Sequence, residues 1–218
     1  MLSTHNNDIN NRDCGGVDAA IVLAAGRSTR MGISKVLLPW ENETVIQQIV
    51  KMLNETSINR IVVITGSETA IIYHLIKEDN ITIIYNPSFE LKDMINSIKI
   101  GLSYLYRHSD NDKVRASFIF LGDMPAVTKN VIKAMINQYH NAQGRIIVPR
   151  YNRRGGHPIL IDRIYWQKII NMVDGKNLRE FMNSPDVLVD YLDVDSDGIL
   201  EDMDTSSDYQ KLIDKYAP

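Results

Sequence analysis

The chain has 218 residues, 44% of them hydrophobic, which is enough for one sizeable α/β domain. Its 24 basic and 27 acidic residues leave a formal net charge of −3, which argues against the broad positive field of a nucleic-acid-binding protein. The lone Cys14 excludes an internal disulfide, and the polar first residues hold no apolar signal core or membrane span. We expect a cytoplasmic protein that binds neither nucleic acid nor membrane, with a flexible tail over residues 1–17 and a single domain over residues 18–218.

From residue 18 onward, short β-branched runs alternate with segments of helical period, which is typical of a parallel sheet with crossover helices. The predicted strands are, in chain order, AAIVLA, RIVVIT, ITIIY, ASFIFLG, RIIVP and VLVDYL. Apolar residues at helical spacing predict helices in TVIQQIVKMLNE, MINSIKIGLSYLY and VIKAMINQYH. The predicted fold is therefore α/β, with a Rossmann-like, doubly wound and mostly parallel sheet.

The first predicted strand runs into LAAGRSTRMGISK, residues 23–35, which holds two glycines and several basic side chains. In open α/β sheets, ligands bind beyond the carboxyl ends of the strands, where this loop lies. Its spacing matches neither a P-loop nor the GxGxxG fingerprint. The glycines would let the backbone approach an anion, and Arg27, Arg30 and Lys35 could bind phosphate oxygens. We interpret the segment as a loop that binds a nucleoside triphosphate; the alternative is an exposed basic loop.

Two further motifs follow later strands. Asp123 comes directly after ASFIFLG and should lie beside the first loop, where its carboxylate could hold Mg²⁺ against triphosphate oxygens. The alternative is an ordinary turn aspartate. In RRGGHPILI, Arg153 and Arg154 precede paired glycines, His157 and an apolar strand, and two arginines beside such a backbone suit an anionic second substrate. His157 is either a hydrogen-bond donor or base, or a structural turn residue before proline.

The acidic segment DVDSDGILEDMD, residues 193–204, nearly matches a calcium-binding EF-hand loop, although Asp204 replaces the usual final glutamate. The preceding VLVDYL is strand-like, whereas an EF-hand needs a helix there. We favour a second interpretation, in which the turn brings Asp204 to Asp123 and completes a site for one or two hard cations. A solvated acidic turn is the remaining alternative.

These motifs resemble those of the molybdenum cofactor cytidylyltransferases, within the nucleotidyltransferases that mature molybdenum cofactor. The resemblance is carried by LAAGRSTRMGISKVLLPW, GDMP, RGGHP, NPSFELKDMINSIKIGL and DMDTSSDY, which together span nearly the whole chain. The chain departs from the family at Asp93, where glycine usually precedes methionine, and at GKNLREFM, where a Gly-Asp-x-Gly-Ala-Arg run is more usual. The run LAAG favours cytosine, because guanylyltransferases of the same superfamily usually carry LAGG.

The resemblance implies a fold of the nucleotide-diphospho-sugar transferase type and the transfer of CMP from CTP to the terminal phosphate of molybdenum cofactor, with release of pyrophosphate. It implies Mg²⁺ as the cofactor, and a transient contact with a molybdoenzyme or its chaperone. The site residues implied are the catalytic Lys35, Arg30 and Asp123, the metal ligands Asp123 and Asp204, the nucleotide-binding Leu23, Ala24, Ala25, Gly26, Arg30, Lys35, Gly66 and Ser97, and the acceptor-binding Arg154, Gly156 and His157. The alternatives are a related transferase that uses GTP or another phosphorylated acceptor, and a non-catalytic nucleotide sensor.

Overall fold

The computed structural model describes residues 17, 19–26, 34–91, 93–108 and 114–217 of the chain. Residues 1–16 of the predicted tail, including Cys14, lie outside the described residues, as do Arg27 and Arg30 of the first loop. Val17, the last residue of the predicted tail, is buried in the hydrophobic core.

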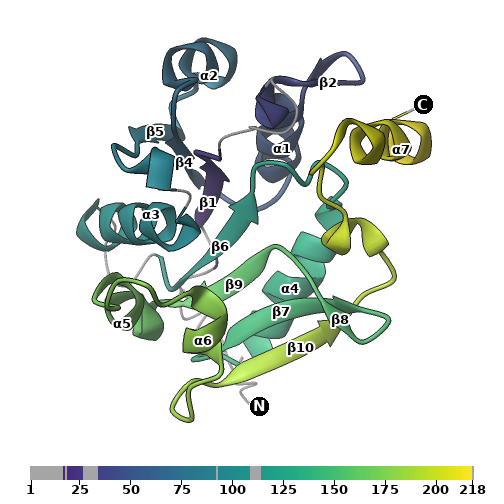
Figure 1. The fold of residues 1–218 in the computed structure, drawn as a ribbon. Coiled ribbons are helices and arrows are strands. Elements are labelled where there is room, and N and C mark those ends of the chain that lie inside the picture. The colour runs from purple at the N-terminus through teal and green to yellow at the C-terminus, as the bar shows by residue number, and fades with distance from the viewer. Residues whose placement is uncertain (1–16, 18, 27–33, 92, 109–113, 218) are drawn as a thin grey trace, which may run out of the picture.

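Within the described residues, the chain forms one eight-stranded sheet with the strand order β10, β7, β9, β6, β1, β4, β5, and β8 pairs with β7 (Figure 1). The strands are β1 (Ala19–Ala24), β4 (Arg60–Thr65), β5 (Ile81–Tyr85), β6 (Ala116–Leu121), β7 (Ile146–Tyr151), β8 (Arg154–Gly155), β9 (Ile159–Asp162) and β10 (Val189–Asp193). The pairings of β9 and β8 are antiparallel and the others are parallel, which confirms a mostly parallel sheet. A small separate hairpin joins β2 (Pro39–Trp40) to β3 (Glu43–Thr44).

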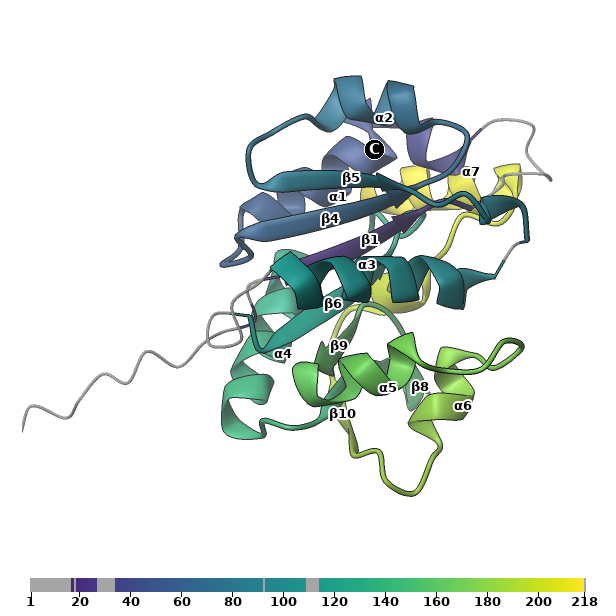
Figure 2. The same ribbon diagram turned by 90° about the vertical axis from the view of Figure 1, so that its left-hand side faces the viewer.

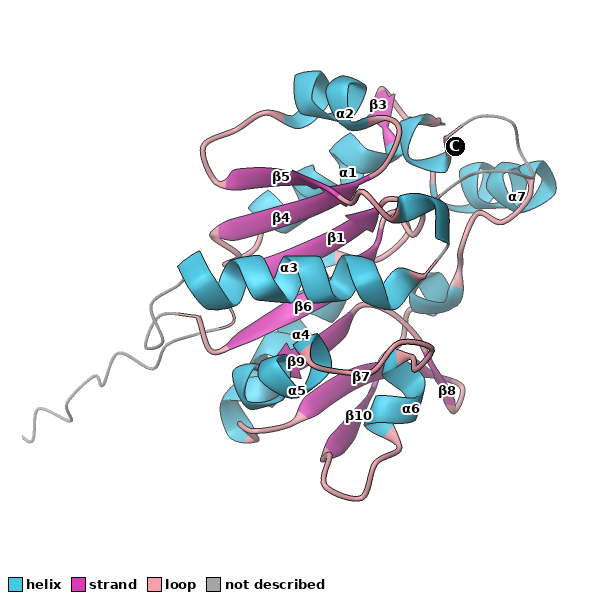
Figure 3. Cartoon of the chain, turned by 60° about the vertical axis from the view of Figure 1, so that its left-hand side comes forward, coloured by secondary structure: helices cyan, strands magenta, loops and turns pink. Residues whose placement is uncertain are grey.

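Helices cover both faces of the sheet. One face packs against α1 (Val45–Asn54), α2 (Thr69–Ile76), α4 (Lys129–Asn141) and α7 (Ser206–Tyr216). The other face packs against α3 (Met94–His108), α5 (Trp166–Ile170) and α6 (Leu178–Met182), which lie along one side of the sheet in Figure 2 and Figure 3. Short 3-10 turns complete the list: η1 (Lys35–Leu37), η2 (Phe89–Leu91), η3 (Arg163–Tyr165) and η4 (Asp197–Leu200).

The central strand β1 explains why the sheet is covered on both sides. Its residues alternate between the two core clusters, with Ala20 and Val22 in one and Ala19 and Ile21 in the other. A strand buried on both faces reads as the near-continuous apolar run AAIVLA, which is the pattern of parallel sheets. The apolar sides of α1, α3 and α4 are likewise buried, as their helical periodicity predicts.

The order of the strands fixes where a ligand can bind. After β1 the chain adds β4 and β5 on one side, and it then crosses to place β6 on the other side of β1. A doubly wound sheet opens a crevice at such a reversal, beyond the carboxyl ends of the strands. The loops that follow β1 and β6 are therefore the first place to look for chemistry. No helix in the described part of the chain is long and apolar enough to cross a bilayer.

Candidate active site

A cleft of about 370 Å³ lies at the expected reversal, beyond the ends of β1, β5 and β6. Its volume falls within the range of roughly 300–1,000 Å³ that small-molecule sites occupy. Five of the residues that line it are charged: Lys35, Asp93, Asp123, Asp202 and Asp204. The remaining lining residues are Leu23, Ala25, Gly26, Val36, Asn86, Phe89, Met94, Ser97, Leu121 and Gly122.

Lys35 joins two carboxylates that are distant in the sequence. Its Nζ donates a hydrogen bond to Oδ2 of Asp123 at 3.1 Å and another to Oδ1 of Asp204 at 2.7 Å. Lys35 is the last residue of the first loop and the first of η1, Asp123 follows β6, and Asp204 comes shortly before α7. The lysine side chain is mostly enclosed, with 17% of its surface exposed, whereas Asp204 is 52% exposed. The structure therefore brings together Lys35 and the two predicted metal ligands.

The charges of this group favour a cation. Burial alone would lower the pKa of Lys35, but the hydrogen bonds and negative charges of Asp204 and Asp123 outweigh it and raise that pKa. Partial desolvation raises the pKa of Asp202, and the neighbouring charges of Asp204 and Asp123 raise it further, against the opposing charge of Lys35. Lys35 therefore bonds to two of these carboxylates, and Asp202 adds a third carboxylate close enough to feel the charges of all three side chains.

Asp202 is a lining residue that the sequence analysis did not single out. The segment Asp202–Met203–Asp204 has no regular helical structure, and Met203 is fully buried in the core. Successive side chains of an extended segment point to opposite sides, so burying Met203 turns both aspartates toward the cleft. The alternation acid, apolar, acid in DMD was the signal that could have predicted it.

Two close backbone contacts hold the segment that carries the aspartates. The main chain at Gly198 packs closely against Ala126, which lies on the connection that follows Asp123. A Cβ atom at Gly198 would lie only 2.3 Å from the carbonyl oxygen of Ala126. A Cβ atom at Gly156 would lie 2.1 Å from the carbonyl oxygen of Ile199, which also accepts a hydrogen bond from the backbone of His157. Only glycine permits such approaches, so both positions shape the site from outside it.

Replacing Gly156 with alanine should lower the free energy of unfolding by about 1–3 kcal/mol, since its methyl group would overlap a backbone oxygen that cannot rotate away. Gly155 is a matched control, because a Cβ atom there would meet a side-chain methyl of Val148 at 3.2 Å. Chemical denaturation should show less than half the loss for Gly155→Ala. Equal losses for the two variants would contradict the assignment of a tight backbone contact to Gly156.

The predicted nucleotide-binding residues divide into those at the surface of the cleft and those beneath it. Leu23, Ala25, Gly26 and Ser97 line the cleft together with Lys35. Ala24 is buried in the core. Gly66 packs closely against the ring of Phe89, so a Cβ atom at this glycine would lie 2.9 Å from the ring. The predicted catalytic residue Arg30 lies outside the described residues.

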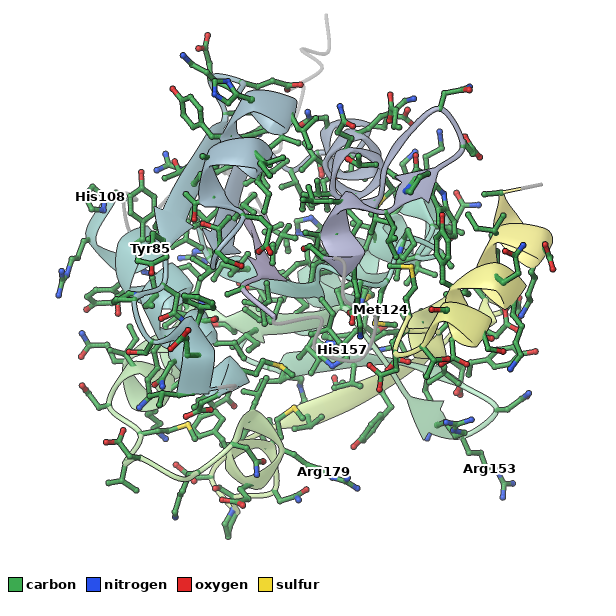
Figure 4. All side chains as sticks on the ribbon, turned by 45° about the horizontal axis from the view of Figure 1, so that its top comes forward. Tyr85, His108, Met124, Arg153, His157 and Arg179 are labelled. Carbon is green, nitrogen blue, oxygen red and sulfur yellow. The ribbon has the colours of Figure 1, made fainter. Side chains whose placement is uncertain are left out.

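The predicted acceptor-binding residues are absent from the described lining of the cleft. Arg154 is exposed on β8, and Arg153 projects outward from the turn between β7 and β8 (Figure 4). Gly156 packs on Ile199, and His157 lies farther inside the molecule, as Figure 4 shows. Burial lowers the pKa of His157, although a hydrogen bond to the carbonyl of Ile119 and the charge of Asp123 oppose this shift. Their role in acceptor binding remains a prediction.

The calcium-loop alternative is not supported by the directions of the carboxylates in residues 193–204. Asp193 forms a bidentate pair with Arg150 at 2.7 and 2.8 Å, and Asp197 pairs with Lys215 and accepts from Tyr216. Asp204 instead bonds to Lys35. An EF-hand loop turns these side chains toward one shared ion, and it follows a helix, whereas this segment follows β10.

The donor set at Lys35 fits Mg²⁺ held jointly by protein and substrate. Asp123 and Asp204 already bind one cationic group between them, the ammonium of Lys35. Mg²⁺ usually takes one or two protein carboxylates and completes its shell with phosphate oxygens and water. Among the described residues, no three or more acidic, histidine or cysteine side chains are grouped so that they could hold a metal ion.

Known proteins resemble this chain in sequence over most or part of its length. The model of the MobA-like NTP transferase domain matches residues 20–188. The molybdenum cofactor cytidylyltransferase of Escherichia coli is 26% identical over 198 residues, which cover 90% of this chain and 96% of that protein. A probable molybdenum cofactor guanylyltransferase of Natranaerobius thermophilus is 26% identical over 132 residues, or 60% of this chain and 59% of its own.

Solved structures share the fold. Rv0371c of Mycobacterium tuberculosis superimposes with a TM-score of 0.75 at 23% identity, covering 90% of this chain and 97% of that one. The structure of the same mycobacterial protein in complex with manganese gives a TM-score of 0.69 at 21% identity, over 90% of this chain and 98% of that chain.

Proposed function

The chain belongs to the MobA-like NTP transferase domain family, and from this premise we propose that it transfers CMP from CTP to the terminal phosphate of molybdenum cofactor. The observation that carries the proposal is the pairing of Lys35 with Asp123 and Asp204 in a cleft at the reversal of the sheet. The acceptor and the nucleotide are drawn from the Escherichia coli relative, which is named a molybdenum cofactor cytidylyltransferase, and from the run LAAG.

The reaction needs little covalent help from the protein. An oxygen of the ionised acceptor phosphate attacks the α-phosphorus of CTP, a new P–O bond forms, and the bond to the β-phosphate oxygen breaks to release pyrophosphate. An ionised phosphate is already a nucleophile, so no protein-bound intermediate is required. Catalysis then consists of aligning the two phosphates and neutralising the charge that accumulates on the triphosphate.

The charged end of the cleft supplies that neutralisation. Lys35, whose raised pKa keeps it protonated, stabilises negative charge on the triphosphate and on the departing pyrophosphate. Asp123 and Asp204 would hold Mg²⁺, which when bound supplies Lewis-acid stabilisation of the phosphate oxygens. Asp202 adds negative charge beside them and strengthens the preference of this end for a divalent cation. The mycobacterial neighbour crystallised with manganese supports a divalent metal in this fold.

The proposal is tested by incubating the purified protein with Mg²⁺, molybdenum cofactor and each of the four nucleoside triphosphates in turn. Pyrophosphate release and the mass of the cofactor product should identify CTP and a cytidylylated cofactor. Tight CTP binding without any product, with active cofactor present, would support a non-catalytic sensor instead. The proposal also includes transient contact with a molybdoenzyme or its chaperone as the route by which the product leaves.

We expect CTP to be preferred over GTP by at least about tenfold in kcat/KM, or about 1.4 kcal/mol of transition-state free energy. Ala25 lines the cleft, although only 7% of the residue is exposed. We expect its methyl group to narrow the space beside the nucleotide, so that a larger purine would clash or leave its polar edge unpaired. Ala25→Gly removes this methyl and should reduce the preference. Competition between equal concentrations of CTP and GTP, read by product mass, measures it.

A mainly guanylated product from the unaltered protein would contradict the choice of CTP while leaving nucleotidyl transfer in place. The matched control is Ala24→Gly, because Ala24 is buried in the core and does not line the cleft. That variant should lower stability without changing the ratio of the two products. If Ala25 only packs under the loop, Ala25→Gly will also leave the ratio unchanged.

A further inference from the structure

The cleft has two chemically different ends, and the difference fixes how a nucleotide lies in it. One end carries Lys35 and three aspartates, which suit a cation and a triphosphate. The other end is built by the connection from β5 to α3 and carries Phe89, Met94 and Ser97. The aromatic ring of Phe89 provides an apolar surface of the kind on which bases stack. The base of a bound nucleotide therefore belongs at the end formed by α3.

Asp93 lies at this second end, and one oxygen of its carboxylate already accepts a hydrogen bond within the protein. Oδ1 accepts a hydrogen bond from the backbone of Ile95 at 3.1 Å, which caps the first turn of α3. The residue is half-buried and lines the cleft. A carboxylate accepts hydrogen bonds through both of its oxygens, so Asp93 can cap the helix and still accept a bond from a ligand. Its negative charge also repels phosphates, which reinforces the orientation given above.

Ser97 supplies the complementary donor on the same side of the helix. Its oxygen accepts a hydrogen bond from Nδ2 of Asn86 at 3.0 Å, which leaves the hydroxyl proton to point elsewhere. Both residues are buried at the wall of the cleft, but the side chain of Asn86 is already engaged at both ends, through Nδ2 to Ser97 and through Oδ1, which accepts from the backbone of Ser88 at 2.8 Å. Asp93 directly precedes α3, Ser97 is the fourth residue of that helix, and both line the cleft, so the start of α3 offers an acceptor and a donor to the same ligand.

From this pair we infer that Asp93 and Ser97 select cytosine over uracil, an inference that rests on the proposed nucleotidyl transfer and extends it. Cytosine presents an amino group as a donor beside its ring nitrogen N3 as an acceptor, which matches the carboxylate and the hydroxyl in order. Uracil reverses both groups, with O4 as an acceptor beside an N3–H donor. The carboxylate of Asp93 would then face a carbonyl oxygen. Adenine shows the same order as cytosine, so its exclusion depends on the clash of a purine with Ala25 that is proposed above.

The variant Asp93→Asn separates base reading from helix capping. Asparagine caps a helix as well as aspartate does, so the midpoint of thermal unfolding should stay within about 2 °C. Its amide can turn either the oxygen or the NH₂ group to the base, so it no longer discriminates between an amino group and a carbonyl. The expected result is a fall of at least about tenfold in the ratio of UTP to CTP dissociation constants.

The experiment measures equilibrium binding of CTP and of UTP to the full chain with Mg²⁺ and without an acceptor, so its outcome is independent of whether transfer to molybdenum cofactor occurs. The unaltered protein should bind CTP more tightly than UTP, by at least about a hundredfold. Asp93→Ser, which also caps the helix but lacks the carboxylate, should lose the preference as well. Equal binding of the two nucleotides by the unaltered protein, or an unchanged ratio in both variants, would overturn the inference.

Discussion

Replacing Asp123 with asparagine should lower the rate of Mg²⁺-dependent transfer by about three orders of magnitude, and Asp204→Asn should have an effect of similar size. An amide keeps the shape of the carboxylate but lacks the charge that holds a hard cation against phosphate oxygens. Its oxygen can still accept from Lys35, so the local structure should persist. Initial rates measured across a range of Mg²⁺ concentrations should show that a higher concentration is needed for half-maximal activity.

The acidic segment provides its own control for this prediction. Asp193→Asn alters an aspartate that is 71% exposed and paired with Arg150, outside the described lining of the cleft. Transfer by that variant should match the unaltered protein. In a calcium loop, Asp193 would be the first ligand and Asp204 the last, so both variants would lose Ca²⁺ binding together. Full activity of Asp204→Asn combined with loss of a tight Ca²⁺ site would restore the EF-hand interpretation and remove the two-carboxylate site.

The arrangement of the strands was largely predictable from the sequence because each buried strand leaves a compact apolar run. All six runs named as strands form strands, and their ends differ by a few residues at most. The direction of β9 was not predictable, because an apolar run such as ILID has the same pattern in either orientation. Its antiparallel pairing with β6 and β7 is set by the short connection from β8.

The short and terminal helices show the limit of periodicity. The segment TAIIYHLI forms α2, but its apolar residues are spread around the whole helix, and two of them, Ile71 and Tyr73, are exposed. The sequence therefore shows no single apolar face that would predict the helix. The start of α7 was predictable by another signal, since Thr205 and Asp208 form a capping box. The departure GKNLREFM forms α6, capped by the side chain of Asn177, and none of its residues lines the cleft.

Within the site, the position of Asp123 beside the first loop followed from the rule that parallel strands end at one edge, and the structure bears it out. Asp204 is a different case, because 169 residues separate it from Lys35 and no local pattern links them. Its place beside Asp123 was proposed from the acidic turn that carries it, and the resemblance then implied the same role as a metal ligand. The structure adds the physical cause, which is the packing of Gly198 and Ile199 between Ala126 and Gly156. Contacts of this kind are invisible in a single sequence.

Replacing Lys35 with alanine should lower turnover by about two orders of magnitude or more while leaving the fold intact, because one electrostatic contact to a transition state is worth about 3 kcal/mol. The surface variant Lys51→Ala, which removes a lysine paired with Glu43, should keep full activity. Steady-state rates of the two variants, with circular dichroism to confirm folding, test the difference. Comparable activity in a correctly folded Lys35→Ala protein would remove the first loop from the catalytic account.

A second measurement on the same variant separates a catalytic role from a structural one. Without nucleotide, the ammonium of Lys35 lies between Asp123 and Asp204 and repels any divalent cation that approaches them. Lys35→Ala leaves both carboxylates without that charge, so it should bind Mn²⁺ alone more tightly than the unaltered protein does, even as its turnover falls. Calorimetric titration with Mn²⁺ measures this affinity. Weaker Mn²⁺ binding by Lys35→Ala would mean that the lysine organises the two aspartates, and would count against a direct role in neutralising the triphosphate.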